Sequence, residues 1–145
     1  MTGDELERRS RPRSERAVEL RVAPRLENLA VVRTLVGAVG TLEDLNVDTV
    51  ADLRLAIDEL CTQLIRSATP DATLLVIVEP RDDDLVVQAS TVCQTSDVLT
   101  PGSFSWHVLT SLADDAQIFH DGREPDGSGG IFGVTLTTRR AGPDR

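Results

Sequence analysis

The sequence predicts a two-layer α/β sandwich, in which a mixed and mainly antiparallel sheet carries its helices on one face. Apolar residues alternate with period two in some segments and recur at helical spacing in others. The segments follow the order strand, helix, helix, strand, strand, helix, strand, strand. Short turns between consecutive strands favour antiparallel pairing. Each helix has a single apolar stripe, so the helices must lie together against one side of the sheet.

The first strand and the first helix are separated by a proline. Residues 18–22 alternate between apolar and charged side chains, which is typical of a half-buried strand, and Pro24 ends it. From Leu26 onward the apolar residues recur three or four positions apart, which predicts a helix. We expect Gly40 to close this helix as its C-cap.

The second helix is predicted over about residues 49–68, after a connector at 41–48. Asp48 or Thr49 is expected to be its N-cap. Its apolar stripe is continuous and comprises Val50, Leu53, Ile57, Leu60 and Leu64.

The second half of the chain predicts four strands and one helix. The turn residues 80–83 connect two of these strands as a hairpin. The predicted elements are strands at 72–79 and 84–92, a helix at about 103–115, and strands at 116–120 and 131–139.

The chain is predicted to contain one folded domain, residues 17–140. Residues 1–16 are charged and lack an apolar period, so they are predicted to be a disordered tail, and residues 141–145 form a second tail. The sequence has no secretory signal peptide and no apolar run of about 20 residues that would span a membrane. We therefore expect a cytoplasmic protein.

The charge balance restricts the class of partner. The net charge is -9, and all 15 basic residues are arginines. A body this acidic repels phosphate backbones, which argues against direct nucleic-acid binding. It suits a basic protein partner, although acidity also serves solubility alone. The absence of lysine excludes a P-loop and a conventional protein-kinase site.

One face of the second predicted helix carries polar residues that are able to perform chemistry. Glu59, Gln63 and Arg66 are spaced at i, i+4 and i+7, beside the apolar stripe. A carboxylate and an amide one turn apart are a possible base and metal ligand. The same spacing is equally typical of the solvated side of an amphipathic helix.

Residues 52–68, DLRLAIDELCTQLIRSA, resemble the N-box helix of the GHKL ATPases, and specifically that of the bacterial anti-sigma factor kinases of the RsbW and sporulation type. Glu59, Thr62 and Gln63 fall on that family's Glu-x-x-Thr-Asn pattern. Residues 102–115, GSFSWHVLTSLADD, resemble the family's glycine box and the helix after it. The resemblance covers about residues 17–140 and is closest to the actinobacterial anti-sigma-F factors.

This resemblance implies the Bergerat-type ATPase fold and a role in stress-dependent transcription regulation. It implies that the protein binds and sequesters an alternative sigma factor of the sigma-F type. It also implies a homodimer, and release of the sigma factor by an anti-anti-sigma antagonist of the STAS type. Arg33 in the first helix, with Leu29 one turn before it, falls on the surface that grips the sigma factor in that family.

The resemblance further implies an ATP and Mg²⁺ site, from which this sequence departs. Glu59 stands where the family's Glu polarises the attacking group, but Gln63 replaces the Asn that holds Mg²⁺. Because Gln is one methylene longer, it fits the strict octahedral geometry of Mg²⁺ poorly.

The two nucleotide boxes depart as well. Ser90, Val92 and Gln94 stand where the adenine-reading box has Asp, Gly and Gly. Gly102 survives in the second box, but Phe104 replaces another glycine. These losses predict that ATP binding is weak or absent. The alternative is an active kinase that phosphorylates a serine of the STAS antagonist.

Two cysteines complete the set of candidate residues. Cys61 and Cys93 fit neither a disulfide framework nor a zinc motif. We expect Cys61, on a buried helix edge, to be inert. Cys93 follows a strand and is expected to be more exposed, which makes it the better candidate for oxidation.

Overall fold

The computed structural model describes residues 15–122 and 130–140. The predicted tails lie outside these ranges except for residues 15 and 16. The elements are β1 (Val18–Val22), a 3-10 turn η1 (Leu26–Asn28), α2 (Leu29–Leu42), α3 (Val47–Ser67), β2 (Leu74–Pro80), β3 (Asp84–Val92), α4 (Phe104–Leu112), β4 (Asp115–Asp121) and β5 (Ile131–Arg139). The predicted order of strands and helices is confirmed. In the described ranges, no helix combines the length and the apolar character needed to cross a bilayer.

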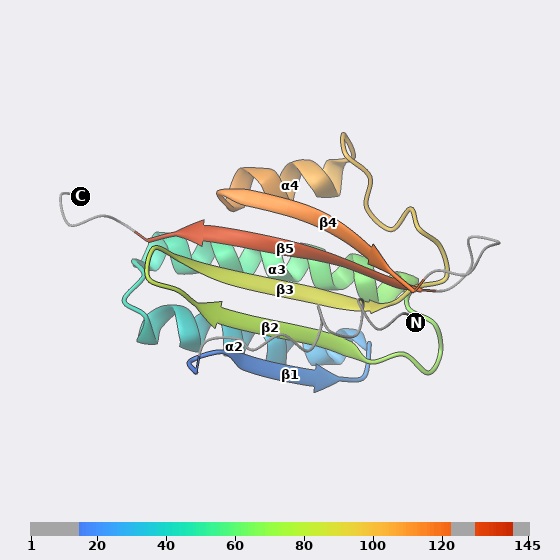
Figure 1. Cartoon of the computed structure of the whole chain (residues 1–145), viewed down its shortest axis with the longest axis horizontal. Helices are drawn as coiled ribbons and strands as arrows, with labels where there is room; N and C mark the ends of the chain where they lie inside the picture. The colour runs from blue at the N-terminus through green and yellow to red at the C-terminus, as the bar shows by residue number, and fades with distance from the viewer. Residues whose placement is uncertain (1–14, 123–129, 141–145) are drawn as a thin grey trace.

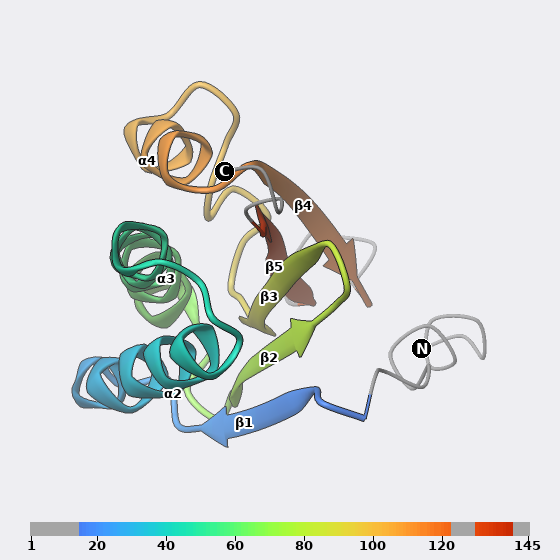
Figure 2. The same ribbon diagram turned by 90° about the vertical axis from the view of Figure 1, so that its left-hand side faces the viewer.

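The sheet has five strands in the order β1-β2-β3-β5-β4 (Figure 1). Every pair of neighbouring strands is antiparallel, whereas the sequence led us to expect a mixed sheet. Helices α2, α3 and α4 all cover one face of this sheet (Figure 2). The predicted two-layer sandwich is therefore confirmed.

Helix α3 forms the centre of the hydrophobic core. Its stripe residues Leu53, Ile57, Leu60 and Leu64 are each 0% exposed. They belong to one cluster with the inward-facing residues of the central strands, which are Val87, Ala89, Phe132, Val134 and Leu136. Each fully buried aliphatic side chain contributes roughly 1.5–3 kcal/mol to folding, so the stripe fixes both the position and the rotation of α3.

The end of α2 differs from the prediction at Gly40. The helix continues to Leu42, and the residue in the left-handed conformation is Asp44, with φ of 62°. The Leu45 amide donates to the Gly40 carbonyl at 3.1 Å, which is a Schellman closure. Gly40 instead allows a close approach of α2 to α3, because a Cβ there would lie 3.1 Å from Cγ2 of Val50. The prediction of Gly40 as C-cap was therefore wrong.

The N-cap of α3 is Asn46, and the prediction of Asp48 or Thr49 was wrong. The Asn46 side-chain oxygen accepts a hydrogen bond from the Thr49 amide at 2.8 Å. Asn is among the best N-cap residues because its short side chain reaches the free amides of the first turn. The helix consequently starts at Val47, two residues earlier than predicted.

A glycine on β5 allows an aromatic ring to lie on the face of the sheet opposite the helices. Phe119 of β4 pairs with Gly133, and a Cβ at Gly133 would lie only 2.2 Å from Cζ of that ring. Aromatic residues commonly cover strand glycines in this way. Ser90 of β3 pairs with Gly133 from the other side. This arrangement identifies Ser90 as a residue of the face away from the helices.

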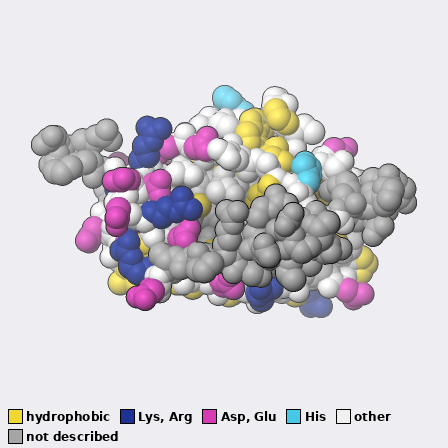
Figure 3. Space-filling view, in the orientation of Figure 1, with side chains coloured by type: hydrophobic (Ala, Val, Ile, Leu, Met, Phe, Trp, Pro, Cys, Tyr) yellow, Lys and Arg dark blue, Asp and Glu magenta, His cyan; other side chains and the backbone are white. Residues whose placement is uncertain are grey.

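Charged side chains of both signs lie interspersed at the end of the molecule where β5 ends (Figure 3). The Glu43 carboxylate forms ion pairs with Arg16, at 2.7 Å, and with Arg140. Arg81 pairs with Glu79 at 3.0 Å in the same region. These contacts tie the α2–α3 corner to the end of the last strand.

Both cysteines are buried, so the prediction that Cys93 is exposed was wrong. Cys61 and Cys93 are each 0% exposed and reduced. The Cys93 amide donates to the Gly130 carbonyl at 2.9 Å, which extends the sheet by one residue, and the Cys93 side chain belongs to the hydrophobic core cluster. Burial, together with the nearby Asp58 carboxylate, raises the pKa of Cys61 from 9.0 to about 12. Both thiols are therefore shielded from oxidants in the folded protein.

Cys61 is expected to determine how the free energy of unfolding falls at alkaline pH. The chain has no lysine and no tyrosine, so only the two thiols among its side chains titrate between about pH 8.5 and 11. The pKa of Cys61 is about 12 in the folded state against 9.0 in the unfolded state. The stability that the protonated thiol contributes is therefore fully present below pH 9. It is then lost as the pH rises towards 12, because the unfolded state releases its proton first. Urea unfolding followed by circular dichroism should show a flatter decline for Cys61→Ala than for the wild type. An equally steep decline in the variant would exclude this thiol as the cause.

Candidate functional site

Glu59 lies at the contact between α3 and α4. Its Oε2 accepts a hydrogen bond from Nε2 of Gln63 at 3.0 Å and a second from Oγ of Ser105 at 2.7 Å. Gln63 is one turn further along α3, as its spacing predicted. Ser105 is in the first turn of α4, and sequence reasoning missed it. The hydrogen bond from Ser105 joins α4 to α3, and the one from Gln63 is within α3.

The start of α4 determines where Ser105 points. Ser103 is the N-cap, and its hydroxyl accepts from the Trp106 amide at 3.2 Å. Trp106 and the fully buried Leu109 then pack α4 against the core. With this face fixed, the hydroxyl of Ser105 is directed towards α3. Serine at a helix start is common enough that spacing alone gave no indication of its partner.

A shallow groove of about 320 Å³ runs beside Glu59 between α3 and α4. Its walls are mainly apolar, and Leu55, which is 57% exposed, is one of them. Asp58 and Glu59 supply its carboxylates. Within the described ranges, no group of three or more His, Cys, Asp or Glu side chains is close enough to hold a metal ion. Arg66, the third residue of the predicted polar face, is exposed one turn beyond Gln63.

The predicted adenine-box residues do not meet Glu59. On β3 the residues that face the helices are Leu85, Val87 and Ala89. Because side chains alternate along a strand, Ser90 and Val92 face the opposite side of the sheet. Glu59 lies in the helix layer and is therefore separated from them by the sheet itself.

The other two nucleotide-box positions lie in the connection between β3 and α4. Gln94 is exposed, and its backbone amide donates to the Ser67 carbonyl, at the end of α3, at 3.0 Å. Gly102 has φ of 91°, and a Cβ there would meet nothing within 4 Å. Phe104 is 78% exposed. Of these positions, Gln94 contacts the end of α3, whereas the Phe104 side chain extends into solvent.

Arg33 is engaged by the neighbouring helix. Its Nε donates to both carboxylate oxygens of Asp58, at 3.1 and 3.0 Å, so α2 and α3 are joined by an ion pair. The Arg33 side chain is 39% exposed. Its two Nη groups have no further partner within the part of the chain that the structure describes. The Nε edge of the guanidinium is thus bound to Asp58, which restrains the Nη edge at the surface.

Leu29, the second predicted sigma-contact residue, is half-buried and packs against the core. Apolar residues that are exposed near the start of α2 are instead Leu26 and Val31, which are 53% and 46% exposed. Val31 and Val18 line an apolar groove of about 490 Å³ between α2 and β1. Neither Leu26 nor Val31 belongs to the buried apolar stripe of α2, which comprises Val32, Val36 and Val39. Apolar residues outside such a stripe indicate a surface contact, and the sequence analysis overlooked this signal.

The comparisons with known proteins identify the family. No protein-family model matches the chain. It is 65% identical over all 145 residues to proteins named anti-sigma-F factor RsbW from two strains of Mycobacterium tuberculosis, CDC 1551 / Oshkosh and ATCC 25618 / H37Rv. The match spans 86% of the length of each relative. The chain belongs to the family of RsbW-type anti-sigma-F factors.

Proposed function

We propose that this chain is an anti-sigma factor, which binds an alternative sigma factor of the sigma-F type and keeps it from directing transcription. The observation that carries this proposal is the 65% identity, over the full chain, to proteins named for that role. The net charge of -9 supports it, because a DNA-binding factor presents a basic surface.

Within that interface, Arg33 is proposed to contact the sigma factor. Its Nε edge is held by Asp58, which leaves the Nη edge facing outward with little freedom to lose on binding. A planar guanidinium fixed in this way is suited to bidentate recognition of a carboxylate on the partner. Leu29 is proposed to support this surface from beneath, since it packs inward.

The Arg33 contact is testable by exchanging charges across the ion pair. Arg33→Glu should weaken binding to a purified sigma-F-type factor at least about tenfold in biolayer interferometry, since truncating a paired interface charge costs about 2–5 kcal/mol. Asp58→Asn removes the ion pair but keeps the cation, and should bind within about threefold of wild type. Unchanged binding by Arg33→Glu would remove Arg33 from the interface.

A control separates a lost contact from a damaged fold. Arg33→Glu combined with Asp58→Arg restores the α2–α3 ion pair with reversed polarity. This double variant should recover the thermal stability of the wild type without recovering sigma binding. Recovery of binding together with stability would mean that Arg33 acts only by holding the two helices together.

We infer that the protein forms a homodimer through β1 and the α2–β1 groove. β1 is an edge strand, and an uncovered strand edge favours pairing with another chain. The groove beside it is apolar and includes Val18 and Val31, which are 37% and 46% exposed. A second copy of the same edge would cover both features symmetrically.

Sedimentation velocity tests the dimer with two matched variants. Val31→Glu should be monomeric at concentrations where the wild type is dimeric, because it introduces a charge into the groove. Val47→Glu is the control, since Val47 is 83% exposed at the start of α3 and does not line the groove. A monomeric wild type, or equal dissociation of both variants, would contradict the assignment.

We further propose that Mg-ATP binds weakly or not at all, and that a STAS-type antagonist releases the sigma factor by competition. The support for this is the engagement of Glu59 by Gln63 and Ser105, and the position of Ser90 and Val92 across the sheet from Glu59. Phosphoryl transfer needs a free base and a bound metal nucleotide in one place. No specific observation favours the kinase alternative.

Calorimetry and a displacement assay examine this proposal together. Titration of ATP with Mg²⁺ should give a dissociation constant weaker than about 1 mM, since several charged hydrogen bonds are missing. The antagonist should displace labelled sigma factor equally with and without ATP. Transfer of labelled phosphate to the antagonist by the wild type, lost in Glu59→Gln, would establish the kinase instead.

A further inference from the structure

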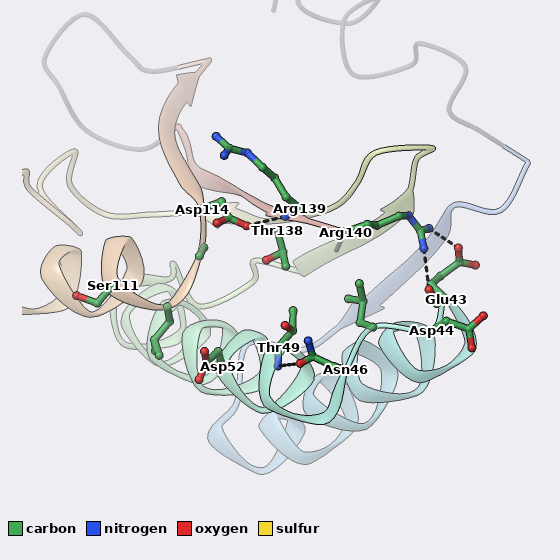
Figure 4. A pocket seen from close by; sticks show the side chains of 13 residues that line it. Glu43, Asp44, Asn46, Thr49, Asp52, Ser111, Asp114, Thr138, Arg139 and Arg140 are labelled. Atoms are coloured by element: carbon green, nitrogen blue, oxygen red, sulfur yellow. Dashed lines mark hydrogen bonds and ion pairs between the residues drawn. The ribbon is translucent and has the colours of Figure 1, made fainter. Parts of the chain in front are cut away.

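A cleft of about 690 Å³ lies at the end of the molecule where β5 ends (Figure 4). Three segments that are distant in sequence form it. They are the corner between α2 and α3 with the first turns of α3, the end of α4, and the last residues of β5. The volume is within the range of small-ligand pockets in proteins.

The floor of the cleft contains a buried hydroxyl without a partner. Thr138 of β5 is 4% exposed, and its Oγ1 has no hydrogen-bond partner among the residues that the structure describes. Figure 4 shows its side chain directed into the space between β5 and the first turns of α3. Buried polar groups in folded proteins are almost always hydrogen-bonded, so an unpaired one facing a cleft indicates a missing partner.

The arginines near the cleft do not give it a positive charge. Arg140 shares the Glu43 carboxylate with Arg16, and its Nε donates to the Arg81 carbonyl at 2.8 Å. The cleft is lined by the carboxylates of Glu43, Asp44, Asp52 and Asp114, which outnumber its two arginines. The Arg139 side chain is directed away from Thr138 and Asp52 (Figure 4). The Arg140 guanidinium is thus engaged by protein acceptors, and the Arg139 side chain does not point towards Thr138.

The acidic residues of the cleft remain largely uncompensated. Asp52, two turns into α3, is exposed and lines the cleft. Asp114 lines it from the opposite side, where its Oδ2 accepts from the Arg139 amide at 2.6 Å. Ser111 and Ala113 place the C-terminal end of α4 there too, and that end of a helix dipole is negative. The positive start of α3 is offset by its own Asp48 and Asp52.

We propose that this cleft binds an organic cation that donates N–H hydrogen bonds, namely an alkylguanidinium or alkylammonium group. Such a group would donate to Oγ1 of Thr138 and to the carboxylates of Asp52 and Asp114. An anion would face the same two carboxylates and be repelled. The group belongs either to an arginine or lysine side chain of a protein partner or to a free polyamine, which share this chemistry.

The first experiment locates binding by ¹⁵N chemical-shift titration of the full chain. Nα-acetyl-arginine amide and spermidine are the probes, and tetramethylammonium is the control because it carries charge without N–H donors. Both probes should shift the amides of Asn46, Thr49 and Thr138 saturably, whereas the control should not. Tighter binding of spermidine identifies a free polyamine as the ligand, and tighter binding of the arginine amide identifies a protein side chain.

Variants then test the residues of the site. Asp52→Asn and Thr138→Val should each weaken the preferred probe at least about fivefold, since each removes one hydrogen-bond acceptor. Asp82→Asn, an exposed carboxylate in the β2–β3 turn outside the cleft, should bind as the wild type does. Thr138→Val should also melt at the same temperature or higher, because it removes an unpaired buried hydroxyl.

Three results would overturn the proposal. One is the absence of saturable shifts around the cleft with either donor probe. Another is wild-type affinity in both Asp52→Asn and Thr138→Val. Equal binding of tetramethylammonium would likewise reject the hydrogen-bonding site and leave only a general attraction between charges.

Discussion

The packing of the α3 stripe against the sheet is the constraint on which the rest of the molecule depends. Once Leu53, Ile57, Leu60 and Leu64 are buried, the helix has no freedom to rotate about its axis. Successive residues of an α-helix are turned by about 100°, so Asp58 and Glu59 must point to different neighbours. Asp58 reaches Arg33 on α2, and Glu59 reaches Ser105 on α4. Two adjacent carboxylates thus hold the outer helices on either side of the central one.

This use of Glu59 bears directly on what the protein is able to do. A carboxylate that accepts two hydrogen bonds within the fold contributes to the alignment of α3 and α4. Recruiting it for chemistry would require those donors to move. The same helices offer rigid surface groups, such as the guanidinium of Arg33, without any rearrangement. In the free protein, Glu59 therefore helps to position α4 against α3, and Arg33 helps to position α2.

Much of the fold was predictable because its signals are local. The alternation at residues 18–22 and the α3 stripe report burial directly, and both were confirmed. The cap of α2 was not predictable, since Gly40 packs closely against Val50 of α3 and the left-handed residue is Asp44. Cys93 was misjudged because the strand pairing that covers it involves Gly130, which is distant in sequence.

The candidate site was predictable only in part, and for a related reason. The proximity of Glu59 and Gln63 follows from helical spacing. The side of the sheet on which Ser90 lies could not be predicted from the sequence. The preceding residues Leu85, Val86 and Val87 are all apolar, so the strand shows no alternation there. The ion pair of Arg33 with Asp58 and the tie from Ser105 join separate helices, so no local pattern encodes them.

The position of Trp106 has a consequence for spectroscopy. It is the only tryptophan, the chain has no tyrosine, and it packs α4 against the core close to Ser105. Intrinsic fluorescence excited at long ultraviolet wavelengths therefore comes from one indole in one peripheral helix. Its emission reports whether α4 is packed against the core. It is insensitive to the separation of α2 and β1 from the core on the far side of α3. A difference between fluorescence and far-ultraviolet melting curves would measure how independently that helix detaches.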